Sequence, residues 1–374
     1  MPKVSVLIPS YNHEKFIGPA IQSVLDQSFR DFELIIVDDG SNDRTAEMIM
    51  KFKDPRIKAF IFTENKGAAI AMAKCLMEAK GEYIATLGSD DLFLPGKLEK
   101  QVKYLDGHAD VGAVFSYAQL IDDDGKDYKN VDHPWYGIFN QPNRSRHEWL
   151  NYFFYNGNCL CHPSVLARRD CYMTISPPDP RFPQTGDFSR WISVCMKYEI
   201  YIIPENLVKF RIRKKKANVS SGKPETKIRQ SWELGKILGN FLLIADGDEL
   251  LKVFPELKVE GEGIDPVLMP YYIAKLALEA DSLFYQPVYN YFALNTLYDL
   301  LADEKKARLL QEKHGFSYND FNKLTGKYNV FNLFPWWTLF FGYSYLGKKL
   351  RILAQNKPIV KNILGMMIRF IRGR

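Results

Sequence analysis

The chain has 374 residues, of which 46% are hydrophobic and 25% charged, and its formal net charge is +6. This composition is ordinary for a folded protein, and the length allows a substantial core and more than one domain. The five cysteines are few and odd in number, which argues against a disulfide framework and for a reducing compartment. No uncharged apolar run of about 18 residues predicts a membrane-spanning helix, and the apolar part of the N-terminus is too short for a signal peptide.

Residues 1 to about 120 alternate between apolar runs rich in Ile and Val and amphipathic segments. The apolar runs predict strands at residues 4–9, 32–37, 57–62, 83–87 and 113–117. The segments between them predict helices at residues 13–27, 43–52, 67–79 and 95–105, with Asp43 as the N-cap of the second. This order is typical of an α/β fold with a mostly parallel sheet covered by helices on both faces.

Two pairs of adjacent acids follow strands of this predicted sheet. Asp38 and Asp39 end the second strand, and Asp90 and Asp91 come shortly after the fourth. Because open α/β sheets bind ligands outside the carboxyl ends of their strands, both pairs are expected in one crevice. Four carboxylates would repel one another there unless a cation or a donor-rich ligand joined them. Their hard oxygen ligands suit Mg²⁺ or Mn²⁺, which in turn suit a diphosphate.

Three loops add candidate contacts for a nucleotide. Residues 9–12 place Tyr11, with a flat face for a base, after the first strand. Residues 38–45 combine glycine and small polar residues, which let the backbone approach a ligand whose hydroxyls the acids can bind. Residues 65–67 precede a helix, so Gly67 either brings the helix N-terminus near a phosphate or allows close helix–strand packing. No G-x-G-x-x-G motif follows the first strand, which disfavours a dinucleotide-binding fold.

The pattern loosens between residues 121 and 220 and becomes helical afterwards. Proline, asparagine, histidine and aromatic residues dominate up to residue 143, which is typical of a ligand-facing surface. Cys159 and Cys161-His162 invite a zinc interpretation, but no second ligand pair stands at a suitable spacing, which favours structural thiols. Residues 271–283 and 289–301 predict helices.

Four of these motifs, at residues 4–12, 38–45, 65–67 and 89–98, resemble the successive signatures of family 2 glycosyltransferases. They come in the family's order and spacing and cover roughly the first 110 residues. The resemblance implies a GT-A (Rossmann-like) fold, a nucleotide-diphosphate sugar donor, a divalent metal, and inversion at the anomeric carbon.

The resemblance also assigns roles by position. It implies nucleotide contacts at Pro9, Tyr11, Asn12, Asp38, Asp39, Asn65, Lys66, Gly67 and Asp90. Asp90 and Asp91 would occupy the metal and diphosphate motif. The family commonly has an acid where this chain has Gly88, which shifts the metal onto Asp90 and, above all, Asp91.

The later motifs match the family less tightly. Residues 161–165 resemble its acceptor-side loop, and residues 186–191 resemble its Glu-Asp element, in which the aspartate is the usual catalytic base. Asp187 is therefore the candidate base, although its place near the start of a helix would also suit a cap. Residues 210–213 resemble a final element in which Arg213 would bind diphosphate oxygens. The alternative for Arg213 is a solvated charge run that continues through residues 214–216.

The end of the chain carries most of its positive charge. No acidic residue follows Asp320, and the last 54 residues have a net charge of +10. Within them, residues 331–374 are first aromatic, then basic and apolar, with apolar residues spaced by three and four. This pattern predicts an amphipathic segment on an anionic membrane surface, or alternatively a helix packed on the catalytic domain. Nucleic acid is a weaker partner, because the charge is confined to a tail on an acidic body.

Together these observations predict a catalytic domain at residues 1–220, a helical region at 225–330 and the amphipathic tail at 331–374. The expected activity is metal-dependent, inverting transfer of a sugar from a nucleotide donor, here a UDP-sugar, to a hydroxyl of a glycan or lipid-linked glycan. The expected location is cytoplasmic, either free or attached peripherally to the cytoplasmic face of the inner membrane. Two alternatives stay open: a polyprenyl-phosphate sugar synthase, and a non-catalytic nucleotide-sugar-binding assembly partner.

Overall fold

The protein is described from a computed structural model, which defines residues 1–214, 218, 223–257, 263–281 and 285–331. The chain forms two compact units, Met1–Arg308 and Leu309–Arg374. The predicted amphipathic segment 331–374 lies outside the described residues except for Phe331. Among the described helices, none is long and apolar enough to cross a bilayer.

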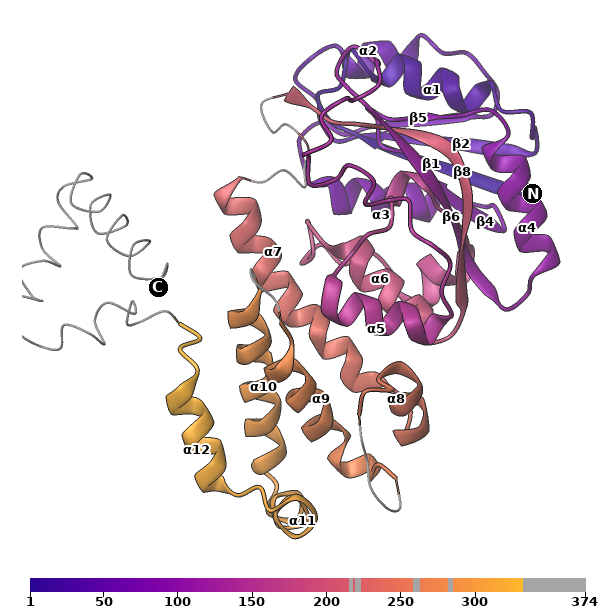
Figure 1. Ribbon diagram of the computed structural model, residues 1–374. Coiled ribbons are helices and arrows are strands. Elements are labelled where there is room, and N and C mark those ends of the chain that lie inside the picture. Colours follow the sequence, from indigo (N-terminus) through magenta and orange to yellow (C-terminus); the bar gives the residue numbers. More distant parts are fainter. Residues whose placement is uncertain (215–217, 219–222, 258–262, 282–284, 332–374) are drawn as a thin grey trace, which may run out of the picture. The chain divides into compact units, whose positions relative to one another are not determined.

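A single mixed sheet organises the first unit (Figure 1). Its strands, in the spatial order β3-β2-β1-β4-β7-β6-β8-β5, are β1 (Val4–Ser10), β2 (Phe32–Asp38), β3 (Ile57–Ile61), β4 (Tyr83–Thr86), β5 (Leu92–Phe93), β6 (Val111–Ile121), β7 (Leu166–Arg168) and β8 (Glu199–Arg211). Strands β3, β2, β1 and β4 are parallel, and β6 pairs with β8 in the same sense. The short strands β7 and β5 pair antiparallel with their neighbours. The sheet confirms the predicted mostly parallel α/β class.

Helices cover the sheet because its central strands are apolar on both sides. These helices are α1 (Ile17–Leu25), α2 (Thr45–Met50), α3 (Ala68–Glu78), α4 (Lys97–Gly107), α5 (Arg146–Asn156) and α6 (Gly186–Cys195). Val4 and Val6 of β1 pack in one core with Ile21 of α1 and Leu98 of α4. Helix α3 packs against β1 and β2, where the Cys75 thiol lies 4.0 Å from the Ile35 carbonyl oxygen.

Two predicted helix starts differ in detail from the structure. Helix α1 begins at Ile17 rather than residue 13, and residues 14–16 form a turn before it, in which the His13 carbonyl accepts from the Phe16 and Ile17 amides. Asp43 is not the N-cap of α2, which is Arg44. Asp43 instead accepts a hydrogen bond from the Thr45 amide at 2.9 Å and holds the loop before the helix.

A layer of helices follows the sheet in the chain and belongs to the same compact unit. It comprises α7 (Pro224–Ile237), a 3-10 turn (Leu238–Leu243), α8 (Gly247–Val253), α9 (Met269–Glu279) and α10 (Gln286–Leu301). Figure 1 shows α5 and α6 between the sheet and these helices. Aromatic side chains fill the contact: the Phe154 ring of α5 packs edge to face with Phe241, Phe254 and Tyr289.

Two further helices, α11 (Glu304–His314) and α12 (Tyr318–Lys327), complete the described chain. Helix α12 lies in the second unit and starts with a capping box, in which Ser317 and Asp320 satisfy each other's backbone amides.

Candidate active site

The polar site lies beyond the carboxyl ends of β1, β2 and β4, as the strand order requires. Ser10, the last residue of β1, is in register with Asp38, the last residue of β2, and β4 flanks β1 on its other side. The loops that follow these strands carry the predicted nucleotide and metal residues.

Asp38 and Asp39 are buried, and their carboxylates organise the loops of the site. Asp38 accepts hydrogen bonds from the Ser41 amide at 3.0 Å and the Ser41 hydroxyl at 2.6 Å. Asp39 accepts from the amides of Lys66 and Gly67 at 2.8 and 2.9 Å. Donors of the chain itself therefore bind both carboxylates of the first pair.

Residues 9–12 lie against the same loops. Asn12 has a left-handed backbone, with φ of 53°. Its amide donates to Ser41 Oγ at 2.9 Å, and its side-chain oxygen accepts from the Asn42 amide at 2.8 Å. Pro9 is partly buried within β1, whereas the Tyr11 ring is exposed and free to stack on a ligand. The structure thus brings the first two predicted nucleotide loops into contact.

The third predicted loop, residues 65–67, packs against the second at Gly40. A Cβ at Gly40 would lie 2.3 Å from the carbonyl carbon of Glu64, and φ of Gly40 is +67°. Asn65 and Lys66 are exposed next to this contact. All three predicted nucleotide loops therefore form one surface.

Asp90 and Asp91 lie at the other side of β1. Asp91 is buried, and its Oδ1 accepts from the Arg211 amide at 2.8 Å. A Cβ at Gly88 would lie 2.4 Å from Asp91 Oδ2 and 3.3 Å from Asp90 Oδ1, so one oxygen of each acid faces the same point. Burial, and then the charge of Asp90, raises the pKa of Asp91 well above its usual value. The repulsion between the two carboxylates is relieved when a cation binds between them.

The residues present fit a divalent cation that also holds a phosphate. Two adjacent carboxylate oxygens face a space that no side chain at Gly88 fills, and Mg²⁺ commonly takes only one or two carboxylates together with substrate phosphates. Within the described part of the chain, no group of three or more His, Cys, Asp or Glu side chains is arranged to hold a metal. Within this part of the chain, Cys159 and Cys161 therefore belong to no such metal-binding group, and both are buried thiols.

Arg213 lies in the site, at its junction with the acid pair. Its Nη1 is 3.2 Å from Asp90 Oδ2, and its Nε is 3.3 Å from Asp123 Oδ1. The Arg213 side chain is 16% exposed, whereas that of Lys214 is 70% exposed. The alternative prediction, that Arg213 belongs to a solvated run of charges, therefore fits Lys214 but not Arg213.

Sequence reasoning missed His13, which joins three parts of the site. Arg213 Nη1 lies 2.8 Å from His13 Nε2 and can only donate, so this nitrogen is the acceptor. The His13 Nδ1–H then donates to Ser89 Oγ at 2.7 Å. Burial lowers the pKa of His13, in agreement with this neutral form. His13 and Arg213 are 200 residues apart in the chain, so no local pattern could have paired them.

Arg211 is a second missed residue. Its Nε donates to the Asp90 carbonyl at 2.7 Å, and its guanidinium lies 4.8 Å from the centre of the Phe16 ring. Arg213 stacks on the same ring at 4.3 Å. Strand β5 secures this arrangement, because Leu92 pairs with Lys209 of β8 immediately beside Asp91 and Arg211.

Asp187 lies in the first turn of α6, one residue after its start. Its Oδ2 accepts from Asn158 Nδ2 at 3.2 Å, and its Oδ1 accepts from the Phe188 amide at 2.8 Å. The N-cap position belongs to Thr185, so Asp187 does not cap the helix. Asn158 is a further residue that the sequence did not single out.

Asp187 and Asp91 both influence the Cys161 thiol electrostatically. Burial raises the pKa of this thiol well above its usual value, and the charges of Asp91 and Asp187 raise it further. Burial also lowers the pKa of the adjacent His162 to about 4, against the opposing effect of Asp187, so His162 is neutral. The arrangement can bind an anion with a divalent cation, beside a carboxylate that can take a proton.

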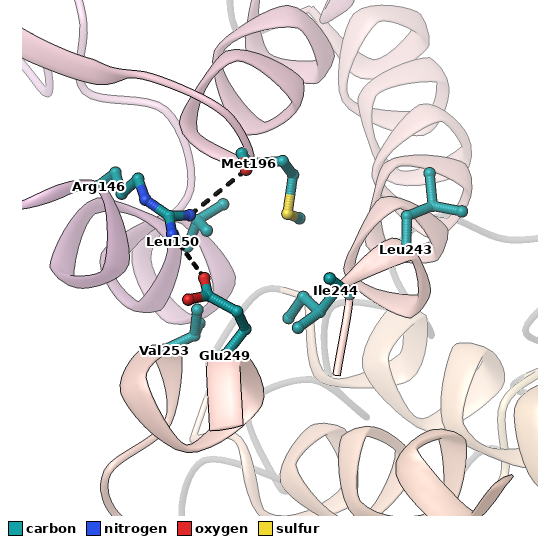
Figure 2. Close-up of a pocket in the computed structure, with 8 residues that line it drawn as sticks. Arg146, Leu150, Met196, Leu243, Ile244, Glu249 and Val253 are labelled. Atoms are coloured by element: carbon teal, nitrogen blue, oxygen red, sulfur yellow. Dashed lines mark hydrogen bonds and ion pairs between the residues drawn. The ribbon is translucent and has the colours of Figure 1, made fainter. Parts of the chain in front are cut away.

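A small pocket is lined by none of the predicted nucleotide, metal or base residues. Figure 2 shows it between α5, α8 and the end of α6, with Leu150, Met196 and Val253 on its walls. Arg146 crosses it to reach Glu249 Oε2 at 2.6 Å and the Met196 carbonyl at 3.3 Å. The pocket thus marks the contact between the sheet layer and the helical layer.

The chain is similar to several known proteins. A family model described as glycosyl transferase family 2 matches residues 5–170. TuaG of Bacillus subtilis, a putative teichuronic acid biosynthesis glycosyltransferase, is 33% identical over 218 residues, which are 56% of this chain and 79% of the relative. WfgD of Escherichia coli, a UDP-Glc:alpha-D-GlcNAc-diphosphoundecaprenol beta-1,3-glucosyltransferase, is 28% identical over 239 residues, which are 64% of this chain and 86% of the relative.

Among solved structures, S. aureus TarS 1-349 in complex with UDP-GlcNAc is similar, with a TM-score of 0.51 and 16% sequence identity. The match covers 87% of this chain and 91% of TarS 1-349. At this identity the likeness concerns the fold alone, and it confirms the predicted GT-A architecture.

Proposed function

Since the chain belongs to glycosyl transferase family 2, we propose that it transfers a sugar from a nucleotide-diphosphate donor to a hydroxyl of a glycan or lipid-linked glycan. We take the donor to be a UDP-sugar and the transfer to invert the anomeric carbon. The named activity of WfgD supports a UDP-sugar donor and a lipid-linked acceptor.

The observation that carries this proposal is the position of Asp187. The charges of Asp91 and of Asp187 of α6 both raise the pKa of the buried Cys161 thiol, so both carboxylates lie within electrostatic range of one residue. A donor held at Asp90 and Asp91 would then present its sugar toward Asp187. We therefore assign Asp187 as the base that takes the proton of the attacking acceptor.

On the donor side, the three loops would hold the nucleoside, with Tyr11 stacked on the base and Asp39 near the ribose. Asp90 and Asp91 would bind a divalent cation, Mn²⁺ or Mg²⁺, which would neutralise charge on the diphosphate as it leaves. Arg213, already within 3.2 Å of Asp90 Oδ2, would donate to the diphosphate oxygens and stabilise the same leaving group.

On the acceptor side, Asp187 would take the proton of the attacking hydroxyl. The hydrogen bond from Asn158 fixes one carboxylate oxygen, and the Phe188 amide fixes the other. The two hydrogen bonds hold the carboxylate in a fixed orientation, as a general base requires. Attack from the face opposite the diphosphate would invert the anomeric carbon.

A panel of UDP- and GDP-sugars would test the proposal by measuring hydrolysis and transfer with and without Mn²⁺ or Mg²⁺. We expect a UDP-sugar to be hydrolysed only with metal, Asp91→Asn to abolish this hydrolysis, and Asp26→Asn, an exposed acid beside α1, to leave it unchanged. Metal-dependent hydrolysis that Asp91→Ala removes would also exclude a non-catalytic binder.

Asp187→Asn separates the proposal from its enzymatic alternative. Transfer to a hydroxyl should fall by roughly 10²- to 10⁴-fold, because the base is lost, while UDP binding persists. A polyprenyl-phosphate acceptor is already ionised and needs no base, so full activity of Asp187→Asn would favour the polyprenyl-phosphate sugar synthase.

We also propose that residues 331–374 bind an anionic membrane surface, because they combine aromatic and basic residues with an apolar face. The test is sedimentation with liposomes that contain anionic lipid. The full chain should pellet and a chain ending at Asp320 should stay in solution. Pelleting of the shorter chain would contradict the proposal.

A further inference from the structure

Glu233 of α7 is a buried carboxylate without a cationic partner in the described part of the chain. Its exposed fraction is 1%, and no ion pair involves it there. One of its oxygens, Oε1, is buried with no hydrogen-bond partner. Burying a carboxylate without a partner costs free energy of folding. The contacts of its other oxygen must therefore offset this cost.

That other oxygen, Oε2, receives three hydrogen bonds from the segment just before α6. The amides of Gln184 and Thr185 donate to it at 3.1 and 2.8 Å, and the Thr185 hydroxyl donates at 2.6 Å. Thr185 is the N-cap residue of α6, but its hydroxyl makes no cap hydrogen bond to the helix. Glu233 therefore fixes the backbone at the point where α6 begins.

The same helix start carries Asp187, two residues after Thr185. A second contact from the helical layer supports the first turn, because Asn240 Nδ2 donates to Ser189 Oγ at 3.1 Å. Asn158 holds Asp187 from the side of α5. A shift of the Gln184–Thr185 backbone would thus move Asp187 directly, whereas the nucleotide loops lie beyond the strands on other elements.

We propose that Glu233 is a positioning residue for the transfer reaction, which holds the start of α6 so that Asp187 meets the acceptor hydroxyl. This inference rests on the proposed role of Asp187 as the base. It assigns part of the catalytic geometry to the helical layer, outside the residues matched by the family model. Glu233 acts through Asp187 and does not touch the reacting atoms.

The test compares variants of the full chain in a transfer assay, with the active fraction normalised by UDP-binding stoichiometry. Glu233→Gln keeps the shape and one acceptor oxygen but loses the charge, and Glu233→Ala loses both. We expect kcat to fall roughly tenfold in the first and 100-fold in the second, because small displacements of a catalytic group have effects of this size. The donor KM should stay within about twofold of wild type in both, because the donor loops are untouched.

Two controls distinguish positioning from general stability. Glu249→Gln removes another carboxylate that joins the helical layer to α5, through Arg146 and His147, and it should leave kcat unchanged. In an Asp187→Asn background, Glu233→Gln should cause no further loss, because the group it positions is gone. If the Glu233 variants do not fold, Thr185→Val can take their place in the test. It removes one of the three donors to Glu233, and we expect a smaller loss of kcat.

The possible failures are separable. Equal losses from Glu233→Gln in the wild-type and Asp187→Asn backgrounds, or a wild-type kcat in Glu233→Gln, would overturn the positioning role alone. Full activity of Asp187→Asn would overturn the base and the positioning role together.

Discussion

Gly88 shows how a single residue sets the geometry of the acid pair. Its absent Cβ leaves room for Asp91 Oδ2, which would otherwise lie 2.4 Å away. Asp91 cannot simply turn aside, because it is buried and its Oδ1 accepts the Arg211 amide. The glycine at position 88, where the family commonly has an acid, is therefore linked to the position of the Asp91 side chain.

Gly88→Ala should weaken metal binding without unfolding the protein. The added methyl group displaces the Asp91 carboxylate, and we expect the metal concentration for half-maximal donor hydrolysis to rise roughly 10- to 100-fold. Gly107→Ala is the matched control, because a Cβ there meets nothing within 4 Å. Unchanged metal dependence in Gly88→Ala would show that Asp91 is not held as described.

Lys97 is fully buried, and its burial gives the stability an unusual pH dependence. Its Nζ donates to Gln101 Oε1 at 2.8 Å and lies 4.1 Å from the centre of the Phe93 ring, yet burial lowers its pKa to about 7. Between pH 7 and about 10 the unfolded lysine holds a proton that the folded lysine has lost. The buried charge of Lys97 thus destabilises the folded state fully below pH 7, and this destabilisation is relieved as the pH rises from 7 toward 10.

We expect the free energy of unfolding of the wild type to rise relative to Lys97→Met by up to about 1.4 kcal/mol per pH unit over this range. Urea denaturation at several pH values measures the difference, and other titrating groups cancel in the comparison. Lys103→Met, at an exposed position of α4, should show no such trend. A difference that does not change with pH over this range would mean that Lys97 stays charged in the fold.

At the scale of elements, the contact between two loops shapes the nucleotide surface. Gly40 has a positive φ, and its missing Cβ lets the loop after β2 touch the backbone of Glu64 and Asn65. Asp39 completes the contact through the Lys66 and Gly67 amides.

Gly40→Ala should separate these loops and lower UDP affinity roughly 10- to 100-fold, by the displacement of several contacts at once. Gly137→Ala is the control, since Gly137 also has a positive φ but a Cβ there meets nothing within 4 Å. Both variants should lose about 1 kcal/mol of stability from backbone strain, and only the first should lose affinity in calorimetric titration. Equal affinities would contradict the role of the loop contact.

The elements also show where sequence reasoning stops. Strands β1 to β4 follow from apolar runs, and the acids at their ends follow from the rule for parallel sheets. Strand β8 was not predicted, because Pro204 and exposed polar residues interrupt its pattern and its pairing with β6 contains register shifts. The contacts of Arg211, Arg213 and Glu233 depend on that strand and on α7, so the sequence identified Arg213 only through a resemblance and the other two not at all.

At the scale of the whole molecule, the helical layer is packed with the sheet layer in one compact unit. The sequence indicated a separate region after residue 225, because composition and periodicity change there while the contacts that join distant segments leave no local trace. Tyr289 of α10, for example, donates to the Phe154 carbonyl of α5. The predicted base and diphosphate residues also follow residue 170, where the family model ends.

The packing of this unit predicts the chemistry of its thiols. All five cysteines are free and buried, and burial raises the pKa of Cys75 well above its usual value. The native protein should therefore show almost no reaction with a thiol reagent over minutes, and five thiols should react after denaturation. Rapid reaction of the native protein at pH 8 would mean that a thiol-bearing segment opens readily.

The glycine at position 88 also limits how this site can be redesigned. Any side chain introduced there would start 2.4 Å from the present position of Asp91 Oδ2. An acid can therefore be built into position 88 only together with a new position for the Asp91 carboxylate.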